Sequence, residues 1–199
     1  SVLWKLYATS YDQRQFTEAV RYCDDGAKRF PDDPRFVRCK LWLQTVRGVT
    51  ANPTMAWQEY QKISSPTPPK DWSPQDWRLL QAEGRMLVAA ALGRTGSLDS
   101  ARKLLAAARP DPADDKEGEL AGVEAFIRTL FGTAQDTTEA LSILNRYASG
   151  SPQHRERLAN SDLFKCPGCG AIFNTAFNDR GFNCWWCVNF SIRFVDFRD

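Results

Sequence analysis

The sequence lacks most of the patterns on which enzymes depend. Its 199 residues include one histidine, His154, and no cysteine stands at metal-ligand spacing from it. There is no phosphate-binding glycine loop, no dinucleotide-binding glycine pattern and no nucleophile elbow. We therefore expect His154 to be a solvated surface side chain and the protein not to be an enzyme.

The net charge is small, and long hydrophobic runs are missing as well. The formal net charge of +2 is too small to indicate a nucleic-acid or anionic-membrane partner. No stretch approaches the roughly 18 apolar residues of a membrane-spanning helix, and no signal peptide is visible. The sequence begins at Ser1 rather than Met, so whether a leader or membrane anchor precedes it stays open. Hydrophobic residues make up 43% and charged residues 25%, as in folded soluble domains.

Four of the six cysteines form two Cys-x-x-Cys turns near the C-terminus. They are Cys166, Cys169, Cys184 and Cys187, with 14 residues between the two pairs. A tight turn directs both sulfurs of a pair to one side, and the intervening segment is long enough for a hairpin that joins the pairs. The spacing predicts a four-thiolate metal site, with disulfide bonds as the alternative. Because such thiolates need reducing surroundings, we expect the cytoplasm or a cytoplasm-facing membrane surface.

Residues 161–199 differ in composition from the rest and form a predicted second domain. They contain nine aromatic residues, and residues 191–198 alternate as in a strand with one apolar face. Further extended segments are predicted at 163–165, 171–175 and 181–183. Four Lys or Arg residues balance four Asp residues, so nucleic-acid binding is not expected. Trp185 and Trp186 are candidates for an exposed patch that contacts a protein partner.

Residues 1–160, the predicted first domain, have apolar residues at helical spacing and four regularly placed alanines. Ala19, Ala56, Ala101 and Ala140 are 37, 45 and 39 residues apart, and a proline follows each after 11 or 12 residues. A small residue lets two helices approach closely, and proline cannot continue a helix. A further helix is predicted upstream of each alanine, at 2–13, 34–48, 74–92 and 114–131. Cys23 and Cys39 fall in two different predicted helices and are expected to be buried thiols.

The four alanine segments resemble the second helix of the tetratricopeptide repeat (TPR). The resemblance implies a mainly α fold, a solenoid of about four helical hairpins whose first helices form a concave surface for a peptide or helix of a protein partner. Transferring the register of the alanines places six residues near that surface. They are Tyr11, Arg38, Thr45, Glu83, Met86 and Thr129.

The cysteine segment resembles the zinc-ribbon and rubredoxin modules, both small β structures. Gly170 after the second cysteine fits both families, whereas Trp185 and Val188 replace the proline and glycine of the second rubredoxin turn. The resemblance therefore implies Zn²⁺, with iron as the minority alternative. Repeats followed by a four-cysteine ribbon are similar in architecture to the bacterial TPR–rubredoxin adaptors that regulate lipopolysaccharide synthesis.

The sequence thus predicts a non-catalytic scaffold or adaptor that binds a protein partner through its repeats and carries a structural zinc ribbon. Three alternatives stay open: an iron electron-transfer module on a TPR scaffold, a nucleic-acid-binding zinc ribbon, and a subunit that joins the parts of a larger complex.

Overall fold

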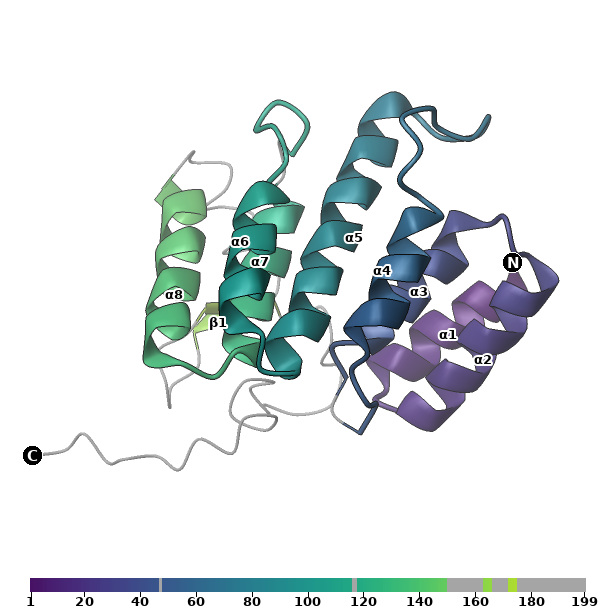
Figure 1. Ribbon diagram of the computed structural model, residues 1–199, viewed down its shortest axis with the longest axis horizontal. Helices are drawn as coiled ribbons and strands as arrows, with labels where there is room; N and C mark the ends of the chain where they lie inside the picture. Colours follow the sequence, from purple (N-terminus) through teal and green to yellow (C-terminus); the bar gives the residue numbers. More distant parts are fainter. Residues whose placement is uncertain (47, 116–117, 150–162, 166–171, 175–199) are drawn as a thin grey trace, which may run out of the picture. The chain divides into compact units, whose positions relative to one another are not determined.

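The structure is a computed structural model that describes residues 1–46, 48–115, 118–149, 163–165 and 172–174 (Figure 1). In these ranges the protein is mainly helical, with eight α-helices and one pair of short strands. The chain divides into two compact units, Ser1–Ile143 and Leu144–Asp199, which are described separately. Among the described residues, no helix combines the length and apolar character needed to cross a membrane.

The helices follow one another through short connections. Their bounds are α1 Val2–Asp12, α2 Phe16–Arg29, α3 Pro34–Leu43, α4 Pro53–Gln61, α5 Pro74–Arg94, α6 Leu98–Ala107, α7 Glu119–Leu130 and α8 Ala134–Ser149. Helix α8 continues from the first unit into the second.

Three of the helices begin with the same local signal. The side chains of Asp33, Asn52 and Ser73 accept hydrogen bonds from backbone N–H groups in the first turns of α3, α4 and α5. A proline follows each of these capping residues and supplies the backbone angle that a first helical turn needs. These starts are therefore set by local sequence, and they match the predicted starts at 34 and 74.

Two predicted boundaries are wrong. Helix α3 ends at Leu43 instead of continuing to 48, because the next residues turn and the Gln44 side chain accepts a hydrogen bond from the backbone N–H of Asn52, at 2.8 Å. Helix α7 begins at Glu119 rather than 114, after Gly118 with a φ of 67°. A left-handed residue cannot sit inside an α-helix, so Gly118 sets that start.

The helices of the first unit pack in a regular order. Each helix from α1 to α5 contacts the next one, while α3 also contacts α1 and α5, and α5 also contacts α7. The odd-numbered helices therefore lie beside one another as a row (Figure 1). The alanine register is confirmed at the level of burial: Ala19, Ala56 and Ala101 are fully buried, and Ala140 is 1% exposed.

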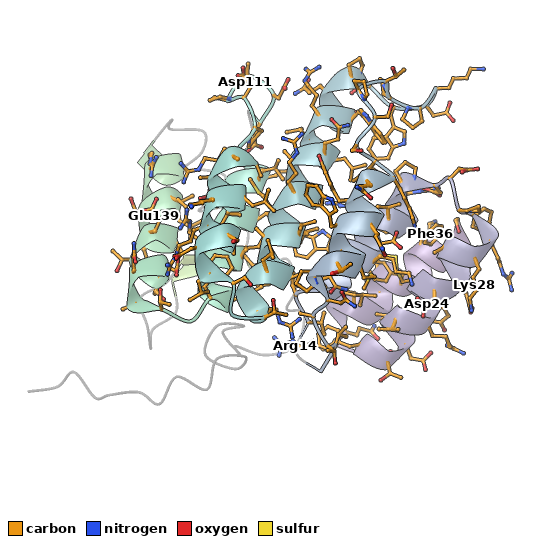
Figure 2. All side chains as sticks on the ribbon, viewed as in Figure 1. Arg14, Asp24, Lys28, Phe36, Asp111 and Glu139 are labelled. Atoms are coloured by element: carbon orange, nitrogen blue, oxygen red, sulfur yellow. A yellow bond between two sulfur atoms is a disulfide. The ribbon has the colours of Figure 1, made fainter. Side chains whose placement is uncertain are left out.

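Buried residues form two clusters that share α3. The larger one joins α3 to α7 and includes Leu41, Leu87 and Ile127. The smaller one joins α1, α2 and α3 and includes Tyr7 and Phe36, the latter labelled in Figure 2. We call them the large core and the small core.

The second unit contains one described pair of strands. β1 Leu163–Lys165 and β2 Ile172–Asn174 are antiparallel, with Lys165 opposite Ile172. They coincide with the predicted extended segments 163–165 and 171–175. The other predicted strands, at 181–183 and 191–198, lie outside the described residues.

Candidate functional site

The candidate site is a surface on the odd-numbered helices, which we call the odd-helix face. It consists of Tyr11 on α1, Arg38 and Trp42 on α3, Glu83 on α5 and Phe126 on α7. Glu83 is buried, and the other four side chains are partly exposed. Contacts between these side chains join helices that are far apart in the sequence.

A paired charge lies at the centre of this face. Both Arg38 Nε and Arg38 Nη2 donate to the Glu83 carboxylate, each at 2.7 Å, and Trp42 Nε1 donates to Glu83 Oε1 at 3.1 Å. A carboxylate that is only 4% exposed needs such partners, because an unpaired buried charge is costly. Burial lowers the pKa of Arg38, but the Glu83 charge and hydrogen bonds outweigh it, so the pKa lies above its ordinary value. The guanidinium is therefore permanently charged.

Aromatic rings continue the face on both sides of this pair. The rings of Tyr11 and Trp42 meet edge to face with centroids 6.4 Å apart, and those of Trp42 and Phe126 stack at 6.0 Å. Tyr11 Oη also forms a 3.3 Å hydrogen bond with Thr45 Oγ1. Burial raises the pKa of Tyr11 to about 12, so the phenol stays neutral at physiological pH.

Helix α5 is deeply buried because it contacts α3, α4, α6 and α7. The stack of Trp42 and Phe126 joins α3 to α7, and Trp42 also donates to Glu83 on α5. Met86 lies three residues after Glu83 and therefore on the same side of α5. Met86 is 1% exposed, so the chain itself covers the middle of the predicted concave surface.

The six residues predicted near the partner surface divide into two groups. Arg38, with 43% of its side chain exposed, and Tyr11 remain accessible in part. The others are buried with 1–4% of their surface exposed: Thr45, Glu83, Met86 and Thr129. The structure brings Tyr11 to Thr45 and Arg38 to Glu83, while the Thr129 hydroxyl donates to the Phe126 backbone carbonyl at 2.6 Å.

Sequence reasoning missed Trp42 and Phe126. Trp42 stands four residues after Arg38 and hence on the same side of its helix, so the register could have revealed it. Phe126 had no comparable signal, because its contact with Trp42 joins two helices that are far apart in the sequence.

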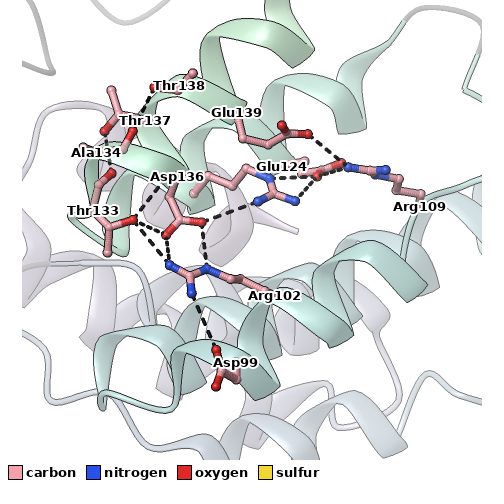
Figure 3. A network of polar contacts seen from close by, with 11 residues as sticks. Asp99, Arg102, Arg109, Glu124, Thr133, Ala134, Asp136, Thr137, Thr138 and Glu139 are labelled. Carbon is pink, nitrogen blue, oxygen red and sulfur yellow. Dashed lines mark hydrogen bonds and ion pairs between the residues drawn. The ribbon is translucent and has the colours of Figure 1, made fainter.

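A second polar network joins α6, α7 and the start of α8 (Figure 3). Arg109 donates twice to the Glu124 carboxylate, each time at 2.8 Å, and Arg128 Nε donates to the same carboxylate at 3.0 Å. Arg102 Nη2 donates to Asp136 Oδ2 at 2.6 Å, and Arg128 Nη1 lies 3.5 Å from Asp136 Oδ1. Because both carboxylates are buried and paired with cations, we interpret this network as a structural link between helices.

Asp136 is also tied to the first turn of its own helix. The Thr133 hydroxyl donates to Asp136 Oδ2 at 2.6 Å and accepts from the Asp136 backbone N–H at 3.1 Å. This reciprocal arrangement fixes the beginning of α8. Burial raises the pKa of Asp136, but hydrogen bonds from Arg102 and Thr133 and the charges of Arg102 and Arg128 outweigh burial, so the net pKa is lowered.

The lowered pKa predicts loss of stability in acid. A carboxylate whose pKa is lower in the folded state stabilises the fold above its unfolded pKa of about 3.9 and loses that contribution as the pH falls through the folded value. We expect the melting temperature to decrease as the pH is lowered beyond about pH 4. In the Asp136→Asn variant, the melting temperature should depend less on pH in this acid range. Thermal melts from pH 7 to pH 2 test this, and an unchanged acid slope in the variant would contradict it.

The remaining candidate residues from the sequence do not belong to the odd-helix face. Cys166, Cys169, Cys184, Cys187, Trp185, Trp186 and His154 all fall outside the described residues. Among the described ones, no group of three or more His, Cys, Asp or Glu side chains could hold a metal ion. Cys23 and Cys39 were expected to be buried thiols: their burial is confirmed, but the structure joins them in a disulfide, so the expectation of thiols is wrong.

Comparisons with known proteins give no family assignment. No protein-family model matches the chain, and searches of curated proteins and of solved structures found no match either.

Proposed function

We propose that the protein is a non-catalytic scaffold or adaptor of the TPR type, which binds a protein partner through its odd-numbered helices. The observation that carries the proposal is the packing order of the first unit. Consecutive helices from α1 to α6 contact each other, odd-numbered helices form a row, and the four anchor alanines are buried where the register requires close helix contact. This is the arrangement that stacked helical hairpins adopt to bury faces that one hairpin cannot bury alone.

The partner site within this proposal is the accessible part of the odd-helix face. Its middle is filled by Trp42 and Phe126, so a partner would contact their edges, Tyr11 and the exposed part of Arg38. Aromatic and arginine side chains are the ones that most often dominate binding energy at protein interfaces. Two hydrogen bonds from Arg38 to Glu83 hold both side chains in position before a partner arrives, which lowers the ordering cost of binding.

Affinity purification with two matched variants tests this site. Val123 is partly exposed and lies three residues before Phe126 on the same side of α7, whereas Trp57 is 44% exposed on the even-numbered helix α4. We expect one protein to be retained by the wild type and by Trp57→Arg but lost with Val123→Arg. Val123 also packs against the large core, so retention is compared at a temperature where circular dichroism shows all three proteins to be folded. Equal retention by the two variants would contradict the proposed site.

The second part of the proposal is a structural zinc module at the C-terminus. β1 and β2 pair antiparallel, and the sequence between Lys165 and Ile172 contains Cys166 and Cys169. Paired strands on both sides of a Cys-x-x-Cys segment are what the first half of a four-thiolate site requires, and Cys184 and Cys187 would supply the other half. Bound Zn²⁺ would add the folding free energy that so small a module cannot obtain from its own core.

Removal of the metal should therefore unfold the zinc module, residues 161–199, and leave the helices that precede it folded. We expect about one Zn²⁺ per chain by elemental analysis, and its loss in Cys184→Ser. In hydrogen exchange, the variant should lose protection after residue 160 while α1 to α4 keep theirs. Uniform loss of protection along the whole chain would contradict a separate module, and a visible absorption band would indicate iron instead of zinc.

A further inference from the structure

The first helical hairpin, α1 and α2, is connected to the rest of the first unit mainly through α3. Helices α1 and α2 contribute to the small core only, and the large core begins with Val37 and Leu41 on α3. The strongest helix contacts of α1 and α2 outside the hairpin are with α3. The small core is shared between this hairpin and α3, so separating the hairpin from α3 would open the small core and leave the large core intact. Such a hairpin is a candidate for opening locally while the remainder stays folded.

The only described disulfide lies at this junction. It joins Cys23 on α2 to Cys39 on α3, with Cα atoms 6.0 Å apart, and both residues are fully buried. The separation is within the usual range for disulfides, so no backbone movement is needed to form the bond. The bond therefore ties the first hairpin covalently to the helix that also carries part of the large core.

The junction can also accommodate the two cysteines in their reduced state. The backbone carbonyl oxygen of Phe36 lies 3.1 Å from Cys39 Sγ and 3.9 Å from Cys23 Sγ. After reduction, the Cys39 thiol can donate to this oxygen, so that thiol has a hydrogen-bond partner. Breaking the bond thus removes a tether without creating a strong reason for the helices to separate.

We propose that Cys23–Cys39 is a redox-controlled tether that determines how readily the α1–α2 hairpin opens from α3. A dithiol reductant transfers two electrons and two protons to the bond: the S–S bond breaks, two thiols form, and the reductant becomes a disulfide. The oxidised protein keeps the hairpin closed. The reduced protein stays folded but opens this hairpin more often, exposing the small core and the α1 part of the odd-helix face.

Hydrogen exchange of the full chain, oxidised and then reduced with dithiothreitol under native conditions, tests the proposal. A disulfide that closes a loop of about this length changes the population of the open state roughly 100-fold, so exchange in α1 and α2 should accelerate by about that factor. Exchange in the middle of α5 should change little. Reoxidation with oxidised glutathione should restore the slow exchange.

The double variant Cys23→Ala/Cys39→Ala separates this effect from effects of the reductant on the other cysteines. It should exchange quickly in α1 and α2 both with and without dithiothreitol. Three results would overturn the proposal: equal acceleration in α5, no acceleration in α1 and α2 of the reduced wild type, or a failure of dithiothreitol to produce two alkylatable thiols at these positions.

Discussion

Replacing Arg38 by alanine should lower the free energy of unfolding by about 2–3 kcal/mol. The variant leaves the Glu83 carboxylate, 4% exposed, with Trp42 Nε1 as its remaining side-chain donor on the odd-helix face. Loss of one partner from a fully buried pair costs about 3–5 kcal/mol, and we expect less here because 43% of the Arg38 side chain is exposed. Urea denaturation measures the change.

Two controls sharpen this prediction. Lys62→Ala removes the exposed ion pair with Glu59 and should cost no more than about 0.5 kcal/mol. The double variant Arg38→Met/Glu83→Met replaces both charges by apolar side chains and should recover most of the loss, because no unpaired charge then remains. If Arg38→Ala were as mild as Lys62→Ala, Glu83 would not depend on Arg38 as the structure indicates.

Replacing Gly26 by alanine should destabilise the small core by about 1–3 kcal/mol. In a helix this change ordinarily stabilises by up to about 1 kcal/mol, because alanine has the higher helix propensity. Here the added Cβ would lie 1.9 Å from Phe36 Cε1, and Phe36 is 1% exposed and stacks on Phe30. The ring has little room to move, so the overlap should outweigh the gain in propensity.

Gly122 provides the matched control for this substitution. It also lies inside a helix, α7, but a Cβ there would meet no atom within 4 Å. Gly122→Ala should therefore stabilise by about 0.5–1 kcal/mol. Opposite signs of the two changes in thermal or urea unfolding would support the packing of α2 on α3, whereas a stabilising Gly26→Ala would contradict it.

The helices could largely be predicted because their signals are local. Caps at Asp33 and Ser73, each followed by proline, fix the starts of α3 and α5 through contacts within one turn. The alanine register predicted burial at four positions because close helix contact admits only a small side chain. Sequence reasoning failed at the end of α3, where the Gln44 side chain bonds the backbone of the following loop, and at the start of α7, where the left-handed conformation of Gly118 was not foreseen.

The surface could be predicted only in part. The register placed Arg38 and Glu83 near one surface without predicting that they pair, and it also placed Met86 there as a residue for partner contact. Met86 is 1% exposed and belongs to the large core, to which five helices contribute. Spacing along one helix contains no information about how its neighbours cover it.

The cysteines show the same limit. Cys23 and Cys39 lie in different helices, and only the packing of α2 on α3 brings their Cα atoms to 6.0 Å. The disulfide also weighs against the predicted cytoplasmic location, because disulfides persist mainly in oxidising compartments. A four-thiolate site and a disulfide are compatible in one chain if zinc protects the thiolates before the disulfide forms.

Site-specific photo-crosslinking tests the central claim, that the odd-numbered helices receive a protein partner. A benzophenone side chain is introduced at Val123 on α7 or, as the control, at Trp57 on α4, and the full chain is irradiated in its native cells. The account predicts a discrete adduct with one protein from position 123 and none from position 57. The same adducts from both positions, or none from position 123, would contradict it.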